Sequence, residues 1–297
     1  MKMKRLQFGR RQFLFGAVAT SFVCGRADGG TETEVSSKAN GGSLRIAHLC
    51  DPQFGFTTGL ASMKWRSAEH YEENYKADLE RCARAIDRIN ELQPDLVLFG
   101  GDMTQRPSDV ERDWPVLLAR LNVPWMVTPG NHDMGNRVTQ DNLSRFRKVF
   151  GKDREARDIK GWRVIAGNSQ FWYRTDAKDE QDAYEKWLRE ELESAKAYNG
   201  RVIVASHIPP FAFIPDEKDS YNSCPISMRF SRLDAYAASG ARFYLAAHQH
   251  RLVVRGYKGV TILSGEAMCD NFDKRPTGFR MFEVNDDFAY SWNFIKI

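Results

Sequence analysis

The sequence has 297 residues, of which 42% are hydrophobic and 28% are charged, a balance that supports a folded core and excludes a wholly disordered chain. The formal net charge of +4 is small, and the basic residues are spread along the chain rather than gathered in a stripe. This distribution argues against nucleic acid as a partner, because nucleic-acid-binding proteins carry a concentrated basic surface.

Residues 1–27 have the order of segments that is typical of an export signal. Basic residues precede an apolar run at 13–23, and small residues follow it. The run covers about 11 residues, too few to cross a bilayer. The pair Arg10-Arg11, followed by Phe13-Leu14, resembles the bacterial twin-arginine export motif. We therefore expect the twin-arginine machinery as a partner and a periplasmic or extracellular location, with a general export signal as the alternative.

Residues 28–42 are rich in Gly, Ser, Thr and Asn and predict a flexible linker. A single domain is expected over 43–297, where apolar strands alternate with helices. Strands are expected at 44–49, 96–99, 125–127, 162–166, 202–205 and 243–246, and helices at 69–92, 110–121, 143–150, 179–198 and 231–239. The remaining segments, 253–257, 260–263, 279–284 and 290–295, alternate like antiparallel strands. The pattern indicates a layered α/β fold whose apolar strands are buried on both faces.

Polar residues that can bind metals come directly after five of the predicted strands. Ligand sites in open α/β sheets form beyond the carboxyl ends of the strands, so we expect these residues to meet in one crevice. Imidazole, carboxylate and amide groups without thiolate favour Zn, Mn or Fe, and a shared carboxylate can hold two ions about 3.5–4 Å apart. The candidate residues are Asp51, Gln53, Asp102, Asn131, His132, Asp133, His207, His248 and His250.

In order and spacing, these residues resemble the calcineurin-like metallophosphoesterases. The pattern of that family is D-x-H, G-D, G-N-H-[D/E], H and G-H-x-H, and the resemblance spans residues 51–250. The tetrad at 130–133, Gly-Asn-His-Asp, is its most diagnostic part. The resemblance implies a sandwich of two mixed β-sheets flanked by helices, with two divalent metal ions as cofactors.

The resemblance also implies a role for each residue. Metal ligands would be Asp51, Asp102 and His250 at one position and Asp102, Asn131, His207 and His248 at the other, with Asp102 bridging. His132 would contact the phosphate beside Asn131 and help to protonate the leaving oxygen, as a catalytic residue. Asp133, the second catalytic candidate, would orient His132.

Two residues depart from the family pattern. Gln53 stands where a histidine ligand is usual, and Ala247 stands where glycine is usual. An amide oxygen is a weaker donor than imidazole, so we expect a looser first metal and a preference for Mn, with Fe, Zn or Mg as alternatives. The sequence Asp51-Pro52-Gln53 resembles the branch that contains calcineurin-like phosphoesterase-domain protein phosphatases. A manganese-dependent ADP-ribose diphosphatase branch shares Asp-x-Gln.

The reaction that the resemblance implies is hydrolysis of phosphate esters by attack of a metal-bound hydroxide. Phosphomonoesters, either small phosphorylated molecules or phosphoproteins, rank first as substrates. Nucleotide diphosphates and phosphodiesters are the alternative within the family. The weak ligand Gln53 also leaves open a protein of another class, which binds metal or phosphate without catalysis.

The segment 209–226 is long, aromatic and poor in regular patterns, and it follows His207. Long loops are often functional, so we expect Phe211 and Tyr221 to contact substrate; the alternative is that they only cover apolar surface. His48 is expected to be structural. The four cysteines beyond the leader have no C-x-x-C spacing and are expected as small buried hydrophobes, with three disulfide connectivities left open.

Overall fold

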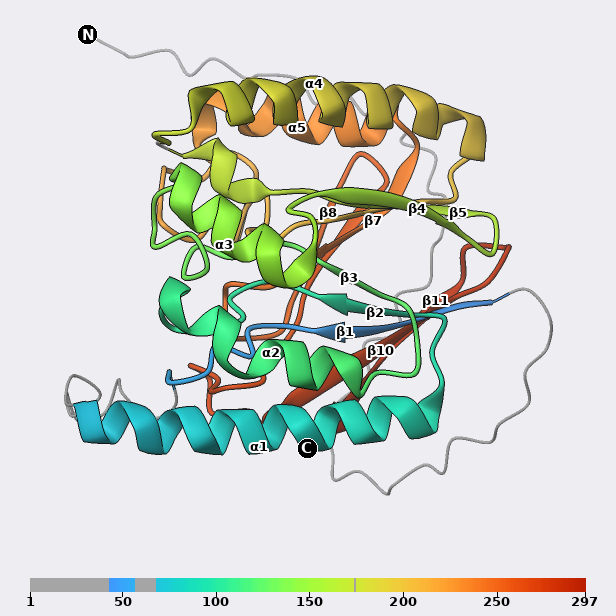
Figure 1. Cartoon of the computed structure of the whole chain (residues 1–297). Helices are drawn as coiled ribbons and strands as arrows, with labels where there is room; N and C mark the ends of the chain where they lie inside the picture. Colours follow the sequence, from blue (N-terminus) through green and yellow to red (C-terminus); the bar gives the residue numbers. More distant parts are fainter. Residues whose placement is uncertain (1–42, 57–67, 174) are drawn as a thin grey trace, which may run out of the picture. The chain divides into compact units, whose positions relative to one another are not determined.

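The computed structural model describes residues 43–56, 68–173 and 175–297 (Figure 1). The export signal expected at 1–27 and the linker expected at 28–42 lie outside the described residues, so both stay predictions. None of the helices in the described ranges has the length and apolar character needed to cross a membrane.

The described part of the chain forms two mixed β-sheets. The first has the strand order β11-β10-β1-β2-β3, and the second has the order β4-β5-β6-β7-β9-β8. In chain order the strands are β1 Leu44–Leu49, β2 Leu96–Phe99, β3 Trp125–Val127, β4 Glu155–Ile159, β5 Trp162–Ala166, β6 Val202–Ala205, β7 Ala241–Ala246, β8 Val253–Tyr257, β9 Val260–Ser264, β10 Gly278–Val284 and β11 Tyr290–Lys296. β1, β2 and β3 run parallel, as do β5, β6, β7 and β9, so the carboxyl ends meet at one edge of each sheet.

Helices flank both sheets. Figure 1 shows α1 and α2 beside the first sheet and α4 and α5 beside the second. Their bounds are α1 Ala68–Leu92, α2 Val110–Ala119, α3 Gln140–Phe150, α4 Lys178–Ala195 and α5 Ile226–Ala238. The expected layered sandwich of two mixed sheets with helices outside is therefore confirmed.

The apolar strands alternate between two buried layers. Ile46 and Leu98 lie in the layer between the sheets, where they share a cluster with Leu245. Their neighbours Ala47 and Phe99 lie in the larger cluster that includes helix residues. Successive side chains of a strand point to opposite faces, so a strand buried on both faces needs a continuous apolar run.

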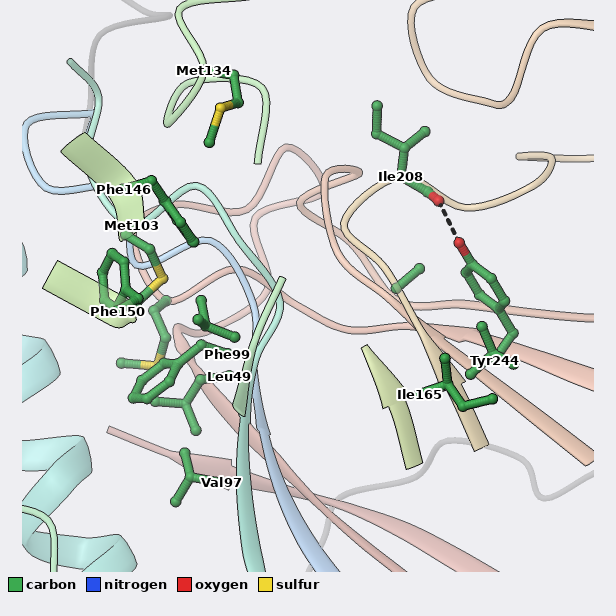
Figure 2. Packing of buried hydrophobic residues seen from close by; sticks show 14 of the residues in the cluster. Leu49, Val97, Phe99, Met103, Met134, Phe146, Phe150, Ile165, Ile208 and Tyr244 are labelled. Atoms are coloured by element: carbon green, nitrogen blue, oxygen red, sulfur yellow. Dashed lines mark hydrogen bonds between the residues drawn. The ribbon is translucent and has the colours of Figure 1, made fainter. Parts of the chain in front are cut away.

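The larger cluster also fixes the loops that follow the strands. Figure 2 shows Phe99, at the end of β2, packed near Met103 and Phe146. On the other side of the cluster, the Tyr244 hydroxyl donates to the Ile208 carbonyl oxygen at 3.0 Å. Packing on both sides therefore holds the chain where β2 and β6 end.

Three details differ from the sequence-based expectation. β9 pairs with β7 in parallel, although its alternation suggested an antiparallel strand. β4 was not expected, because this edge strand is rich in charged residues, which discourage pairing with other chains. α5 begins at Ile226 rather than at 231, directly after Pro225. The four described cysteines are free and buried, as small apolar residues.

Candidate metal centre

Side chains from five strand ends meet beyond the carboxyl edges of the two sheets. Asp51 follows β1, Asp102 follows β2 and Asn131 follows β3. From the second sheet, His207 follows β6, and His248 with His250 follows β7. All six side chains are at most 6% exposed, so polar groups from distant parts of the chain share one buried site.

The turns that carry these residues are held in an unusual backbone conformation. Five of the candidate ligands have positive φ angles: Asp51 (46°), Gln53 (38°), Asp102 (53°), His248 (69°) and His250 (47°). The left-handed conformation costs non-glycine residues free energy and is concentrated at functional sites. These turns therefore keep a locally unfavourable backbone conformation that places the side chains in the site.

Close packing explains the glycines of the Gly-Asp and Gly-Asn-His-Asp motifs. Gly101 has a φ of 94°, and a Cβ atom there would lie 2.7 Å from the Gly130 nitrogen. A Cβ atom on Gly130 would lie 2.0 Å from Oδ1 of Asp102. Side chains at these two positions would push the loops after β2 and β3 apart, and Asp102 would lose its place.

His207 lies at the centre of a closely spaced group of possible metal-ligand atoms. Its Nε2 atom is 3.1 Å from Asn131 Oδ1, 3.1 Å from His248 Nδ1 and 3.4 Å from Asp102 Oδ2. The ligand atoms of Asp102, His207 and His248 all lie within 4.8 Å of one another. Imidazole nitrogens, a carboxylate and an amide oxygen at this separation suit a divalent metal ion.

Backbone carbonyls fix which nitrogen of each histidine is free. Nδ1 of His207 donates to the Gly100 carbonyl oxygen at 2.8 Å, and Nδ1 of His250 donates to that of Asp270 at 2.8 Å. Nε2 of His248 donates to the Tyr221 carbonyl oxygen at 2.9 Å. A carbonyl only accepts hydrogen bonds, so these nitrogens carry protons, and the other nitrogen of each ring is the one that can offer a lone pair to a metal. This is the arrangement that metal-binding histidines require.

The second half of the site is built around Asp51. Its carboxylate accepts from the His248 backbone nitrogen at 3.0 Å, and Nε2 of His250 lies 3.7 Å from its Oδ1. Gln53 lies beside this pair, with its Nε2 donating to Oε1 of Gln105 at 3.0 Å and its Oε1 3.7 Å from the Cys269 sulfur. Both polar atoms of the Gln53 amide thus already have a partner, which agrees with the expectation of a weak metal ligand.

The electrostatics of the site call for additional positive charge. Burial raises the pKa of Asp51 to about 8, and burial together with the Asp102 charge raises that of Asp133 to about 7. Burial would lower the pKa of His207, but the carboxylates of Asp102 and Asp51 raise it to about 9. Burial lowers the pKa of His248 to about 3 and that of His250 to about 4. Three buried carboxylates thus face one readily protonated imidazole, and divalent cations would supply the missing charge.

His132 lies at the edge of this group, but Asp133 does not contact its ring. The His132 backbone nitrogen donates to Asp102 Oδ1 at 2.8 Å, and its Nδ1 donates to the Gln105 carbonyl oxygen at 3.2 Å. Both carboxylate oxygens of Asp133 accept from backbone nitrogens, those of Met103 and Gly130, at 2.8 Å. The expectation that Asp133 orients His132 directly is therefore wrong, because Asp133 binds the loops together and Gln105 holds the ring.

Of the two residues expected to contact substrate in the loop after β6, the structure places only Tyr221 at the site. The Tyr221 hydroxyl accepts from Nδ2 of Asn131, and its ring centroid is 4.8 Å from that of His248. Phe211 is buried in the larger core cluster, with 1% exposure. The expectation that Phe211 contacts substrate is therefore not supported: its aromatic ring fills the interior beneath the loop.

Sequence reasoning missed three residues that support the site. Gln105 holds the side chain of Gln53 and the ring of His132. Asn136 accepts from Nδ2 of Asn131 at 2.9 Å, so the amide oxygen of Asn131 faces His207. Arg229 is fully buried and binds the loop that carries Tyr221. Arg229 alone had a signal in the sequence, because it is an arginine in the apolar pattern of α5. Gln105 and Asn136 lie in loops without periodicity, so the sequence did not mark them.

Comparison with known proteins identifies the family. Residues 44–252 match the family model described as calcineurin-like phosphoesterase, and the chain therefore belongs to this family. It is a hydrolase that acts on phosphoric ester bonds.

Three similar proteins illustrate the range of the family. The chain is 26% identical over 269 residues to the serine/threonine-protein phosphatase CPPED1 of Danio rerio, which covers 86% of this chain and 85% of the relative. It is 26% identical over 213 residues to a probable cyclic nucleotide phosphodiesterase of Synechococcus, with 70% and 78% covered. The solved structure of a dimetal phosphatase from Danio rerio shares the fold, with a TM-score of 0.53 and 12% identity over 85% of this chain and 97% of that chain.

Proposed function

We propose that the protein is a phosphomonoesterase with two divalent metal ions. The observation that carries this proposal is the set of three histidines whose carbonyl-bound tautomers turn their free nitrogens toward the carboxylates. One metal position would be held by Asp51, Asp102 and His250, with Gln53 as the weak ligand, and the other by Asp102, Asn131, His207 and His248. Relatives named as phosphatases support the choice of monoesters.

Side chains of the protein would bind the phosphate and transfer the proton. Bound divalent ions would supply Lewis acidity for the phosphate and lower the pKa of a water molecule. His132 would bind a phosphate oxygen beside Asp102, and Asn131 would bind one with the Nδ2 hydrogen that now contacts the Tyr221 hydroxyl. Because Nδ1 of His132 is held by the Gln105 carbonyl, its Nε2 would be the atom toward substrate, and His132 in its imidazolium form would pass the Nε2 proton to the leaving oxygen and become neutral.

Manganese is the proposed metal at the first position. The supporting observation is the donor set there, in which oxygen atoms of Asp51, Asp102 and Gln53 outnumber the single imidazole of His250. Oxygen-rich sets favour Mn or Mg over Zn. Metal content after equilibration with a Mn and Zn mixture tests this, and selective uptake of Zn at both positions would contradict it.

Phosphodiester hydrolysis is the second candidate activity, favoured by the similarity to the Synechococcus protein named as a probable cyclic nucleotide phosphodiesterase. An assay that follows release of p-nitrophenol from the nitrophenyl esters, and the products of nucleotide hydrolysis by chromatography, separates the two with Mn, Fe, Zn and Mg in turn. We expect p-nitrophenyl phosphate to be turned over faster than bis-p-nitrophenyl phosphate and nucleotide diphosphates. The reverse order would establish the diesterase or diphosphatase, and no turnover with any metal would exclude both.

We also propose that the protein is exported through the twin-arginine machinery and acts on phosphorylated small molecules or proteins outside the cytoplasm. The support is the sequence at 1–27, with Arg10-Arg11 before an apolar run. Replacing both arginines by lysine should leave the full-length protein in the cytoplasmic fraction. Unchanged delivery of the double variant to the periplasm would point to a general export signal instead.

A further inference from the structure

A pocket of about 230 Å³ adjoins the metal centre on the side of Asn131. Among its buried lining residues are Val138, Gln170 and Ile208, which are at most 5% exposed. Its rim is formed by exposed side chains, among them Tyr221. The residues that line it are Asn131, Asn136, Arg137, Val138, Gln170, Tyr173, Ile208 and Tyr221. A group placed there would lie beside a phosphate bound at Asn131.

The floor of this pocket is rigid. The carbonyl of Ile208 accepts from the Tyr244 hydroxyl at 3.0 Å, so the chain after β6 cannot shift freely (Figure 2). Nε2 of Gln170 donates to the Pro129 carbonyl at 3.3 Å, which leaves its amide oxygen as an acceptor. The Tyr173 hydroxyl donates to the Ser223 carbonyl at 2.5 Å, so Tyr173 offers its ring as a wall.

The chemistry of the lining disfavours a second phosphate. Arg137 is the single cation among the described residues that line the pocket, and it is already paired with Asp176. Val138 and Ile208 are aliphatic, and the amide oxygen of Gln170 accepts rather than donates hydrogen bonds. A phosphate or carboxylate would find no free cation there, whereas an apolar group with one hydroxyl or amine donor would find matching partners.

The size of the pocket also limits its ligand. Pockets for drug-sized ligands usually measure roughly 300–1,000 Å³, and this one is smaller. A single ring or a short branched chain fills this volume, whereas a nucleoside, with a base and a sugar, would extend past the rim into solvent. Because the floor is fixed by hydrogen bonds, the limit is set by the side chains of Val138 and Ile208.

We propose that this pocket binds the alcohol portion of the phosphate ester and restricts it to a compact, mostly apolar group without a second phosphate. The proposal rests on the proposed phosphomonoesterase activity and adds its substrate class. Val138 and Ile208 determine specificity through the depth of the pocket. They act on the alcohol portion only, because the phosphate itself is bound at the metal centre.

Two opposite changes of volume test the proposal in the full-length, Mn-loaded enzyme. Ile208→Ala deepens the pocket, and Val138→Leu fills it. The readout is kcat/KM for p-nitrophenyl phosphate and for adenosine 5′-monophosphate. A methylene in an apolar pocket is worth about 10-fold or more in discrimination. We expect Ile208→Ala to shift the ratio about 10-fold toward the nucleotide, and Val138→Leu to raise KM for p-nitrophenyl phosphate several-fold.

Inorganic phosphate and a matched variant provide the controls. Inhibition by inorganic phosphate should stay within about twofold in both variants, because phosphate does not occupy the pocket. Ile203→Ala makes the same change between the sheets, away from the pocket, and should leave the substrate ratio unchanged. Thermal unfolding identifies any variant that does not fold, in which case the other variant decides.

The outcomes separate this proposal from the proposed function. If the wild-type enzyme hydrolyses no phosphomonoester with any metal, the proposed function fails. If it is active but the folded pocket variants keep the wild-type substrate ratio, only the pocket proposal is overturned. The same ratio shift in Ile203→Ala would also overturn it, since the effect would then be a general loss of packing.

Discussion

Replacing Arg229 by methionine should loosen the loop that covers the metal centre. Arg229 lies in the first turn of α5, and its side chain is completely buried. Its guanidinium donates to the carbonyl oxygens of Cys224, Pro215 and Glu217 at 2.7–3.0 Å, and to the Ser223 hydroxyl at 3.2 Å. Methionine keeps the apolar stem but removes all of these donors.

The expected loss of stability follows from the acceptors that remain. Each hydrogen bond from a charged donor contributes about 1.5–3 kcal/mol, but the burial of the guanidinium offsets much of the sum. An acceptor left buried without a partner costs about 1–3 kcal/mol unless the loop opens to water. We expect the free energy of unfolding to fall by about 3 kcal/mol, which corresponds to a Tm about 6–12 °C lower.

The more specific consequence concerns the metal. The loop brings the Tyr221 carbonyl to His248 and the Tyr221 hydroxyl to Asn131. Loss of such supporting contacts typically lowers metal affinity about 10–100-fold. Titration calorimetry with Mn measures this, and Arg232→Met on the same helix is the control, because Arg232 pairs with Glu185 instead. Unchanged Mn affinity in a folded Arg229→Met protein would refute the positioning role of the loop.

Three further predictions concern single residues. His132→Gln should keep its metal content but lose about 100-fold in kcat, because glutamine cannot pass a proton; an intact kcat would remove His132 from the proposed reaction. Gln53→His should retain more Zn after dialysis against a chelator, since imidazole is the better donor; equal retention would argue that Gln53 is not a ligand. Burial lowers the pKa of His48 from 6.5 to about 3. Between these pH values His48 binds a proton in the unfolded chain but not in the folded protein. Stability should therefore fall by up to about 1.4 kcal/mol per pH unit as pH drops from 6.5 toward 3, and denaturant titrations should show a weaker fall in His48→Leu.

The sequence predicted well which side chains meet at the site, because each of them follows closely the strand that places it. An apolar run that ends at Asp102 or His207 contains both the structural and the chemical signal in a few adjacent residues. The alternation of strands and helices likewise predicted the layers. The polar edge strand β4 was not predicted, because its residues lack the apolar pattern on which strand prediction depends.

Contacts between distant loops could not be predicted in the same way. His132 is held by the carbonyl of Gln105, and His248 by that of Tyr221. Every residue has a backbone carbonyl, so the sequence contains no mark of which one is used. Phe211 and Tyr221 lie in one aromatic loop without periodicity, and only packing distinguishes the buried ring from the exposed one.

The pairing of β1 with β10 sets an order of events during synthesis. Leu44 lies beside Val284, so β1 has only one of its two neighbours until the last strands have left the ribosome. Contacts between such distant residues form slowly, because the entropy of loop closure is lost before the contact is gained. Asp51 and Gln53 extend from β1, whereas His207 extends from a sheet whose strands are all made earlier. We therefore expect the proposed first metal position to be complete only in the finished chain rather than during translation.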